Sequence, residues 1–276
     1  MKFAICNEQY GGWSFPRVCE HVASSGYDGV ELAPFTFHED PAQLTLETGR
    51  GIGATAGAAG LEIVGFHWLL ASPKGLHLTT ADTAVRQRTG AFLQHLVRLC
   101  AEAGGRVMVF GSPKQRDLEP GTEYEDAFRR GVETCRGACE VAGTLGVTLA
   151  MEPLGPAETN FLVYIDETLR FIEAVDHPAC RLHLDVKAMA QESRSVPDLI
   201  RAHGAAAAHF HANDTNLRAP GFGETDFVPI GRALRDAKYD GYVSIEVFDN
   251  SVDPVETATR GLAHLKETFR EAGLIN

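Results

Sequence analysis

Short apolar runs alternate with longer amphipathic segments along the whole chain. Each run has about the length of a buried strand, and the longer segments repeat apolar residues at helical spacing, as Phe92, Leu96 and Leu99 do. The runs predict eight strands, over 2–6, 29–33, 61–67, 106–110, 148–152, 182–185, 208–211 and 243–246. The longer segments predict helices between them, over 14–25, 41–59, 80–103, 123–145, 166–175, 197–203, 228–237 and 254–271.

This alternation defines the expected fold. Strands that alternate with helices imply a parallel sheet. Eight such units in 276 residues favour a closed (β/α)8 TIM barrel over an open doubly wound sheet. No Gly-x-Gly-x-x-Gly follows the first strand, which argues against a dinucleotide-binding fold. Because the strands are evenly spaced and no linker interrupts them, we expect a single α/β domain over 1–276.

Composition and charge narrow the class of partner. The formal net charge of −12 argues against nonspecific attraction to nucleic acid or to an anionic membrane surface. The six cysteines are scattered without a Cys-x-x-Cys pair, as in a protein that keeps its thiols reduced. The first apolar run is too short for a signal peptide, and no stretch is long enough to span a bilayer. We therefore expect a cytoplasmic protein.

Four of the predicted strands end on a side chain that could bind a metal. Pro153 follows the first of these side chains and stops its strand, since proline cannot donate to a sheet ladder. In a barrel of this type the carboxyl ends of all strands face one mouth. A single strand-end carboxylate often caps a helix or pairs with arginine, but four candidates on consecutive strands favour a metal site. The four are Glu152, Asp185, His211 and Glu246. Their oxygen and imidazole donors suit one divalent ion, Mn²⁺, Mg²⁺ or Co²⁺, with Zn²⁺ possible.

Other polar residues near the mouth leave two interpretations open. Lys114 and Arg116 form a basic loop after the fourth strand, and Lys187 follows Asp185. Together they could bind an anionic substrate such as a sugar phosphate or a keto acid, or the loop could simply be solvated. His67, at the end of the third strand, could line the pocket or be a hydrogen-bonded histidine of the barrel interior.

At these residues the chain resembles the xylose isomerase-like TIM-barrel superfamily of sugar isomerases and epimerases. The nearest members are the ketose 3-epimerases (D-tagatose and D-psicose 3-epimerase) and hydroxypyruvate isomerase-like proteins. The resemblance covers the whole chain in outline. Its specific parts are Met151-Glu152-Pro153-Leu154, the loop Glu158-Thr159-Asn160-Phe161, Leu184-Asp185, His211 with the polar loop into Pro220-Gly221, and Ser244-Ile245-Glu246.

The resemblance implies a reaction and roles for the residues. It implies that Glu152, Asp185, His211 and Glu246 bind one Mn²⁺-like ion. It also implies that Glu152 and Glu246 exchange a proton at the carbon next to the carbonyl of a ketose or related polyhydroxy compound, through an enediolate that the metal stabilises. Glu158 resembles the family's loop glutamate, which hydrogen-bonds the substrate. The implied partner is a small sugar-derived substrate, without nucleic acid or membrane, in a possible homo-oligomer.

The chain departs from the family pattern at two substrate-binding positions. Where the epimerases place a histidine three residues after the aspartate ligand, this chain has Ala188, with Lys187 beside it. Where they place an arginine after the histidine ligand, Leu217 and Arg218 compete, and we choose Arg218. These departures bear on the substrate and leave the metal ligands unchanged.

Three alternatives to an isomerase remain. The first is a metal-dependent lyase or dehydratase on the same scaffold, resembling inosose dehydratase or 3-dehydroshikimate dehydratase, for which Lys187 would suit a more acidic substrate. The second is a DNA-repair enzyme resembling endonuclease IV, which the acidic charge and the ligands for only one metal disfavour. The third is a binding protein without catalytic activity.

Overall fold

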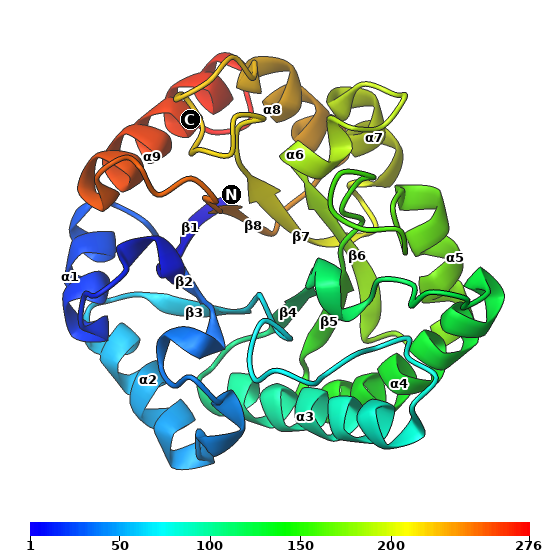
Figure 1. The fold of residues 1–276 in the computed structure, drawn as a ribbon. Helices are drawn as coiled ribbons and strands as arrows, with labels where there is room; N and C mark the ends of the chain where they lie inside the picture. Colours follow the sequence, from blue (N-terminus) through cyan, green and yellow to red (C-terminus); the bar gives the residue numbers. More distant parts are fainter.

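Eight parallel strands close into one barrel in the computed structural model, which describes all residues 1–276 (Figure 1). Each strand pairs with its neighbours in chain order, and β8 pairs with β1. The strands are β1 (Lys2–Cys6), β2 (Gly29–Leu32), β3 (Glu62–Phe66), β4 (Val107–Phe110), β5 (Thr148–Met151), β6 (Cys180–Asp185), β7 (Ala207–Ala212) and β8 (Tyr242–Ile245). The predicted (β/α)8 fold is confirmed.

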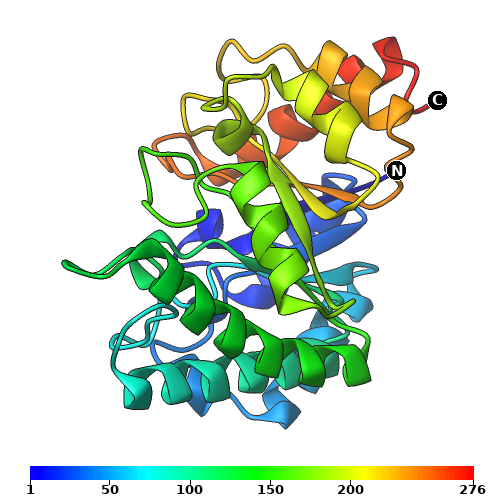
Figure 2. The ribbon, with the colours of Figure 1, turned by 90° about the vertical axis from the view of Figure 1, so that its right-hand side faces the viewer.

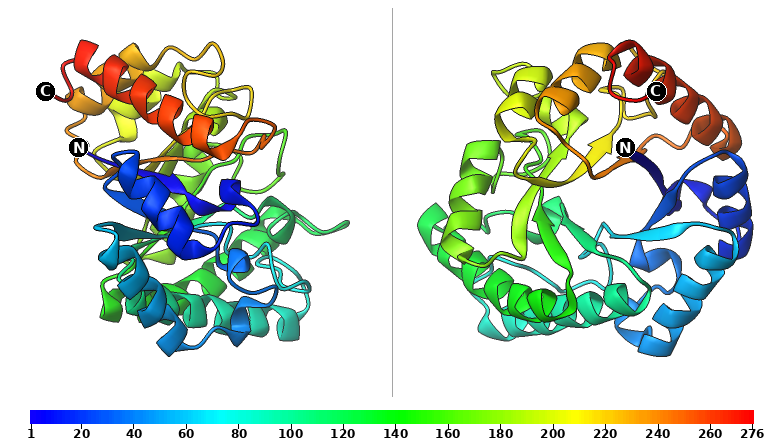
Figure 3. Two further views of the ribbon diagram at one scale, coloured as in Figure 1. Left: turned by 90° about the vertical axis from the view of Figure 1, so that its left-hand side faces the viewer. Right: turned by 180° about the vertical axis from the view of Figure 1, so that it is seen from behind.

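The helices form an outer ring around the barrel, as both end-on views show (Figures 1 and 3). They are α1 (Phe15–Ser24), α2 (Leu46–Ala58), α3 (Thr83–Glu102), α4 (Tyr124–Leu145), α5 (Ile165–Val175), α6 (Val186–Met189), α7 (Val196–His203), α8 (Phe227–Asp236) and α9 (Pro254–Glu271). No helix combines the length and the apolar composition that a bilayer span requires. All six cysteines are buried and free.

Two helical segments differ from the prediction. The helix expected over 41–59 begins at Leu46, because Thr45 caps it by accepting a hydrogen bond from the backbone of Thr48, and a short 3-10 turn precedes it. The four-residue helix α6 follows Asp185 directly and was not expected from the sequence. It forms where the Asp185 side chain accepts a hydrogen bond from the backbone of Ala188, as an N-cap does.

The longer loops gather on one face of the molecule, at the left of Figure 2. They leave the carboxyl ends of the strands and connect β2 to α2, β3 to α3, β4 to α4, β5 to α5, and β7 to α8. This is the face at which the active sites of such barrels lie. The candidate site residues are therefore placed by the rigid strand ends and enclosed by these loops.

Candidate active site

The four predicted metal ligands lie at the mouth end of adjacent strands. Asp185 ends β6 and lies opposite His211 of β7 in the sheet register. Glu152 directly follows β5, and Glu246 directly follows β8. All four side chains are buried, and Glu246 Oε2 lies 3.0 Å from His211 Nδ1. The structure therefore brings together side chains that are far apart in the sequence.

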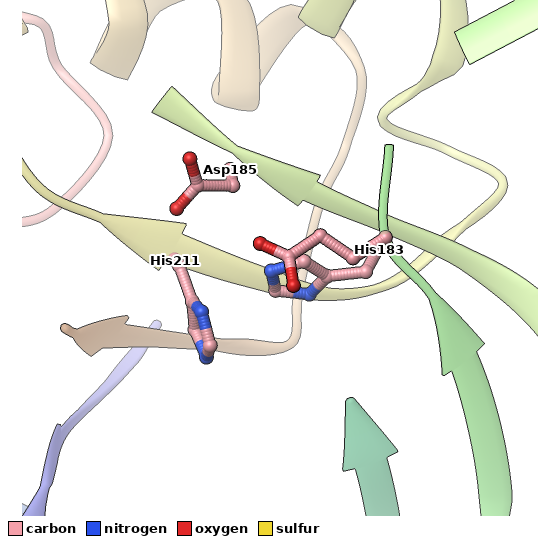
Figure 4. A group of neighbouring side chains, drawn as sticks. His183, Asp185 and His211 are labelled. Atoms are coloured by element: carbon pink, nitrogen blue, oxygen red, sulfur yellow. The ribbon is translucent and has the colours of Figure 1, made fainter. Parts of the chain in front are cut away.

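His183 joins three of these residues in one group of donor atoms. One donor atom from each of Glu152, His183, Asp185 and His211 lies within 4.8 Å of the others. Figure 4 shows His183 and Asp185 of β6 as neighbours of His211 of β7. His183 is fully buried, yet neither ring nitrogen has a hydrogen-bond partner in the protein. Orphaned imidazole nitrogens beside two carboxylates fit a divalent cation.

Glu246 belongs to a second, neighbouring group. Its Oε1 lies 3.2 Å from His67 Nδ1, and His67 Nε2 lies 2.9 Å from Glu8 Oε2. Burial disfavours the charged imidazole, but the Glu8 and Glu246 carboxylates outweigh this effect and raise the pKa of His67 well above its usual value. Glu246 is thus held by His67 on one oxygen and by His211 on the other.

The two candidate catalytic glutamates have opposite protonation preferences. Burial raises the pKa of Glu152 well above its usual value, and the neighbouring Glu246 and Asp185 carboxylates raise it further. For Glu246 burial acts in the same direction, but His211 and His67 outweigh it and lower the pKa. A pair of carboxyl groups whose pKa values are pushed apart can serve as an acid and a base at the same pH.

Asp185 is positioned by hydrogen bonds from neighbouring elements. Its Oδ1 accepts from the backbone of Ala188 at 2.7 Å, and its Oδ2 accepts from the side-chain amide of Asn213. Asn213 in turn accepts from the backbone of Lys187 at 2.8 Å. The carboxylate is therefore fixed by both α6 and the end of β7.

An ion pair lies beside the cleft at the mouth, and its glutamate, Glu158, lines the cleft. Lys187 Nζ lies 2.7 Å from Glu158 Oε1 and 4.0 Å from the centre of the Phe248 ring. Burial disfavours the ammonium, but Asp185 and Glu158 outweigh it and raise the pKa of Lys187, so the side chain is a cation. The cleft is lined by His67, Trp68, Val109, Gly111, Ser112, Pro113, Glu152, Leu154, Glu158, Glu246 and Phe248.

The remaining basic residues lie outside this cleft. Arg116 is fully buried and donates to the backbone carbonyl oxygens of Glu152 at 2.8 Å and Leu162 at 3.5 Å. It therefore joins two loops and does not form the substrate-facing basic pair expected from the sequence. Lys114, the other residue of the expected basic pair, is exposed on a 3-10 turn. Arg218 bonds to Asp249 at 2.8 Å and to Ser251, in the loop after β8.

Two carboxylates of the site were not predicted from the sequence. Glu31, near the end of β2, lies 2.8 Å from His209 Nε2 and 3.1 Å from His211 Nε2. Burial opposes its ionisation, but the two histidines lower its pKa well below the usual value. Glu8 lies in the 3-10 turn after β1 and reaches His67. Glu31 is a carboxylate near a strand end, as Glu152 is, and this shared position was the available signal.

The fold and the site together define a TIM-barrel enzyme with carboxylates and imidazoles gathered at its mouth. The chain matches the family model described as "Xylose isomerase-like TIM barrel" over residues 19–268. It therefore belongs to the xylose isomerase-like TIM-barrel family, and the predicted superfamily is confirmed. Its class of activity is that of an isomerase or epimerase.

Individual relatives are ketose 3-epimerases. The chain is 30% identical to D-psicose 3-epimerase of Agrobacterium fabrum over 248 residues, which cover 86% of this chain and 81% of that one. A structure of D-psicose 3-epimerase with D-tagatose from Clostridium cellulolyticum H10 superposes with a TM-score of 0.82 at 23% identity, covering 98% and 99% of the two chains. A structure of L-ribulose 3-epimerase has a TM-score of 0.86 at 22% identity and covers 99% and 95%. At these identities the solved structures show the fold.

Proposed function

We propose that the protein is a divalent-metal-dependent epimerase or isomerase that acts on a ketose or a related polyhydroxy carbonyl compound. The observation that carries the proposal is the pair Glu152 and Glu246. Both carboxyl groups line one cleft, and their pKa values are shifted in opposite directions. The kinship with ketose 3-epimerases supports the choice of substrate class.

The residues proposed to hold the ion are Glu152, Asp185, His211 and Glu246, and Mn²⁺ is the metal that we expect. The donor set fits, because donor atoms of Glu152, Asp185 and His211 lie within 4.8 Å of one another, and Glu246 lies 3.0 Å from His211 Nδ1. His183 is the competing fourth donor, since its ring nitrogens have no other partner. When bound, the ion would polarise the substrate carbonyl and make the hydrogen on the adjacent carbon more acidic.

The two glutamates would carry out the proton transfer. Glu246, held ionised by His67 and His211, accepts the proton from the carbon next to the carbonyl. Glu152, which lines the same cleft, gives a proton to the opposite face of that carbon. One C–H bond is broken and one is formed, so the configuration inverts. In the reverse reaction the two groups exchange roles.

The remaining groups of the cleft would bind and orient the sugar. Glu158 and Lys187 provide an acceptor and a donor for hydroxyl groups on one side, and His67 lies beside Glu246. Trp68 and Phe248 pack 6.2 Å apart between ring centres and give the cleft an aromatic wall. Hydroxyl groups and apolar ring faces of a sugar match this combination.

The test is hydrogen exchange into a panel of ketoses in deuterated water. With Mn²⁺ added, we expect deuterium to appear at the carbon next to the carbonyl of at least one ketose, together with its epimer or isomer. A chelator should abolish the exchange, and added Mn²⁺ should restore it. If no ketose exchanges in the presence of Mn²⁺, the proposal is overturned.

A second candidate function is that of a dehydratase on the same scaffold, and Lys187 is the residue that favours it. A charged lysine within the site could donate a proton to a departing hydroxyl group after the same abstraction at carbon. The same panel separates the two functions, because a dehydratase would give a product lighter by one water and no epimer.

A further inference from the structure

Below the proposed metal ligands, a buried carboxylate reaches across the barrel interior. Glu31 is 1% exposed and comes from β2, whereas both of its partners come from β7. These strands are not neighbours, since β1 and β8 lie between them. Glu31 therefore spans the barrel lumen, and no arginine or lysine pairs with it there.

The contact with Glu31 keeps a hydrogen on Nε2 of His211. An ionised carboxylate can only accept hydrogen bonds, so His211 Nε2, at 3.1 Å from Glu31 Oε1, must donate. Nδ1 also faces an ionised carboxylate, so in the protein without metal His211 carries a hydrogen on both nitrogens, and a cation bound at the mouth would replace only the one on Nδ1. This is the nitrogen that faces the mouth, because it lies 3.0 Å from Glu246 Oε2. A histidine that binds a metal commonly donates its other ring hydrogen to a carboxylate in this way.

His209 holds the Glu31 carboxylate in place. Its Nε2 lies 2.8 Å from Glu31 Oε2, and its ring packs against that of His211, with 5.1 Å between centres. It stands two residues before His211 on β7, so both rings enter the lumen on the same side of the strand. The two histidines thus provide two donors for the two oxygens of one buried carboxylate.

We propose that Glu31 is a positioning residue, which fixes the orientation of His211 and selects the tautomer that binds the ion through Nδ1. This inference rests on the metal site of the proposed function. Glu31 itself is not a ligand of that site, because it reaches His211 from the side opposite the mouth. It affects the reaction only through His211.

The first test measures Mn²⁺ affinity by competition with a chelator, without reference to activity. Glu31→Gln keeps the shape but loses the charge, and we expect the dissociation constant for Mn²⁺ to rise about 10- to 100-fold. Glu62→Gln is the matched control on the next strand, where the carboxylate is exposed and pairs with Lys2, and its affinity should be unchanged. A purely structural Glu31 would lower the unfolding temperature but leave the Mn²⁺ affinity of the folded protein unchanged.

The second test needs no variant. In wild-type protein labelled with ¹⁵N-histidine and loaded with Zn²⁺, His211 should carry its hydrogen on Nε2 and bind the metal through Nδ1. A hydrogen on Nδ1, or a Mn²⁺ affinity of Glu31→Gln within twofold of wild type, overturns the proposal. If the wild-type protein binds neither metal, the metal site of the proposed function fails, and the inference fails with it. If it binds metal equally well without the Glu31 charge, only this inference fails.

Discussion

Glu246 is the residue whose replacement tests the proton transfer most directly. Glu246→Gln keeps an oxygen donor but cannot accept a proton. We expect kcat at saturating Mn²⁺ to fall by about 10²- to 10⁴-fold. Metal content, measured on the same samples, separates loss of the base from loss of the ion. Glu267→Gln, exposed on α9, is the control and should retain full activity. A kcat for Glu246→Gln within threefold of wild type would rule out this carboxylate as the base.

Lys187 pairs with Glu158 beside the cleft, and the effect of replacing it should fall on substrate binding. Lys187→Met removes the cation that pairs with Glu158. A hydrogen bond to a charged group contributes about 1.5–3 kcal/mol, so KM should rise about 10- to 100-fold. Lys114→Met changes an exposed lysine outside the cleft and should leave KM unchanged. Equal KM values for the two variants would show that Lys187 does not contribute to substrate binding.

At this scale the sequence was informative about strand-end residues and uninformative about loop side chains. Pro153 marked the end of a strand, so the position of Glu152 could be predicted. Arg116 lies in a polar run that is typical of an exposed loop. Its guanidinium nevertheless donates hydrogen bonds to two backbone carbonyl oxygens within the folded loops. That outcome depends on loop conformation, which no local pattern encodes. The helix α6, which carries Lys187, was not predicted either, because it forms where the Asp185 side chain caps it.

At the scale of the element, α2 contains several glycines, which lower its helix propensity. Gly53 lies against α3, where a Cβ would meet the backbone oxygen of Ala103 at 2.6 Å, and Gly49 packs beside Leu99. The glycines that lower the helix propensity thus permit close contact with the next helix. Tertiary packing therefore overrides propensity in this segment, and sequence reasoning placed the helix correctly but could not place its start.

Two substitutions in α2 test this explanation. Gly53→Ala should destabilise the protein by about 1–3 kcal/mol, because the methyl group would overlap backbone that cannot move freely. Gly51→Ala is the matched control in the same helix, where no atom lies within 4 Å of the new Cβ, and it should stabilise by about 0.4–1 kcal/mol. Urea unfolding measures both values. A stabilising Gly53→Ala would show that the contact between α2 and α3 is loose.

At the scale of the whole molecule, closure of the barrel is what turns separate strand ends into a site. The alternation of strands and helices was sufficient to predict closure, and closure placed Glu152, Asp185, His211 and Glu246 at one mouth. Contacts across the lumen, such as that between Glu31 and His209, could not be predicted in the same way. They depend on side chains from strands that are neighbours neither in the sequence nor in the sheet.

The most direct measurement of the central claim is the number of Mn²⁺ ions bound per chain at equilibrium. We expect one ion in the wild-type protein and loss of most of the affinity in Asp185→Asn, because Asp185 is fully buried and its donor atom lies within 4.8 Å of those of Glu152 and His211. Asp198→Asn, an exposed change on α7, should bind as wild type does. Binding of one Mn²⁺ per chain by wild type, its loss in Asp185→Asn and its retention in Asp198→Asn is the predicted result. A wild-type protein that binds no Mn²⁺, or an Asp185→Asn variant that binds it equally well, would contradict the account.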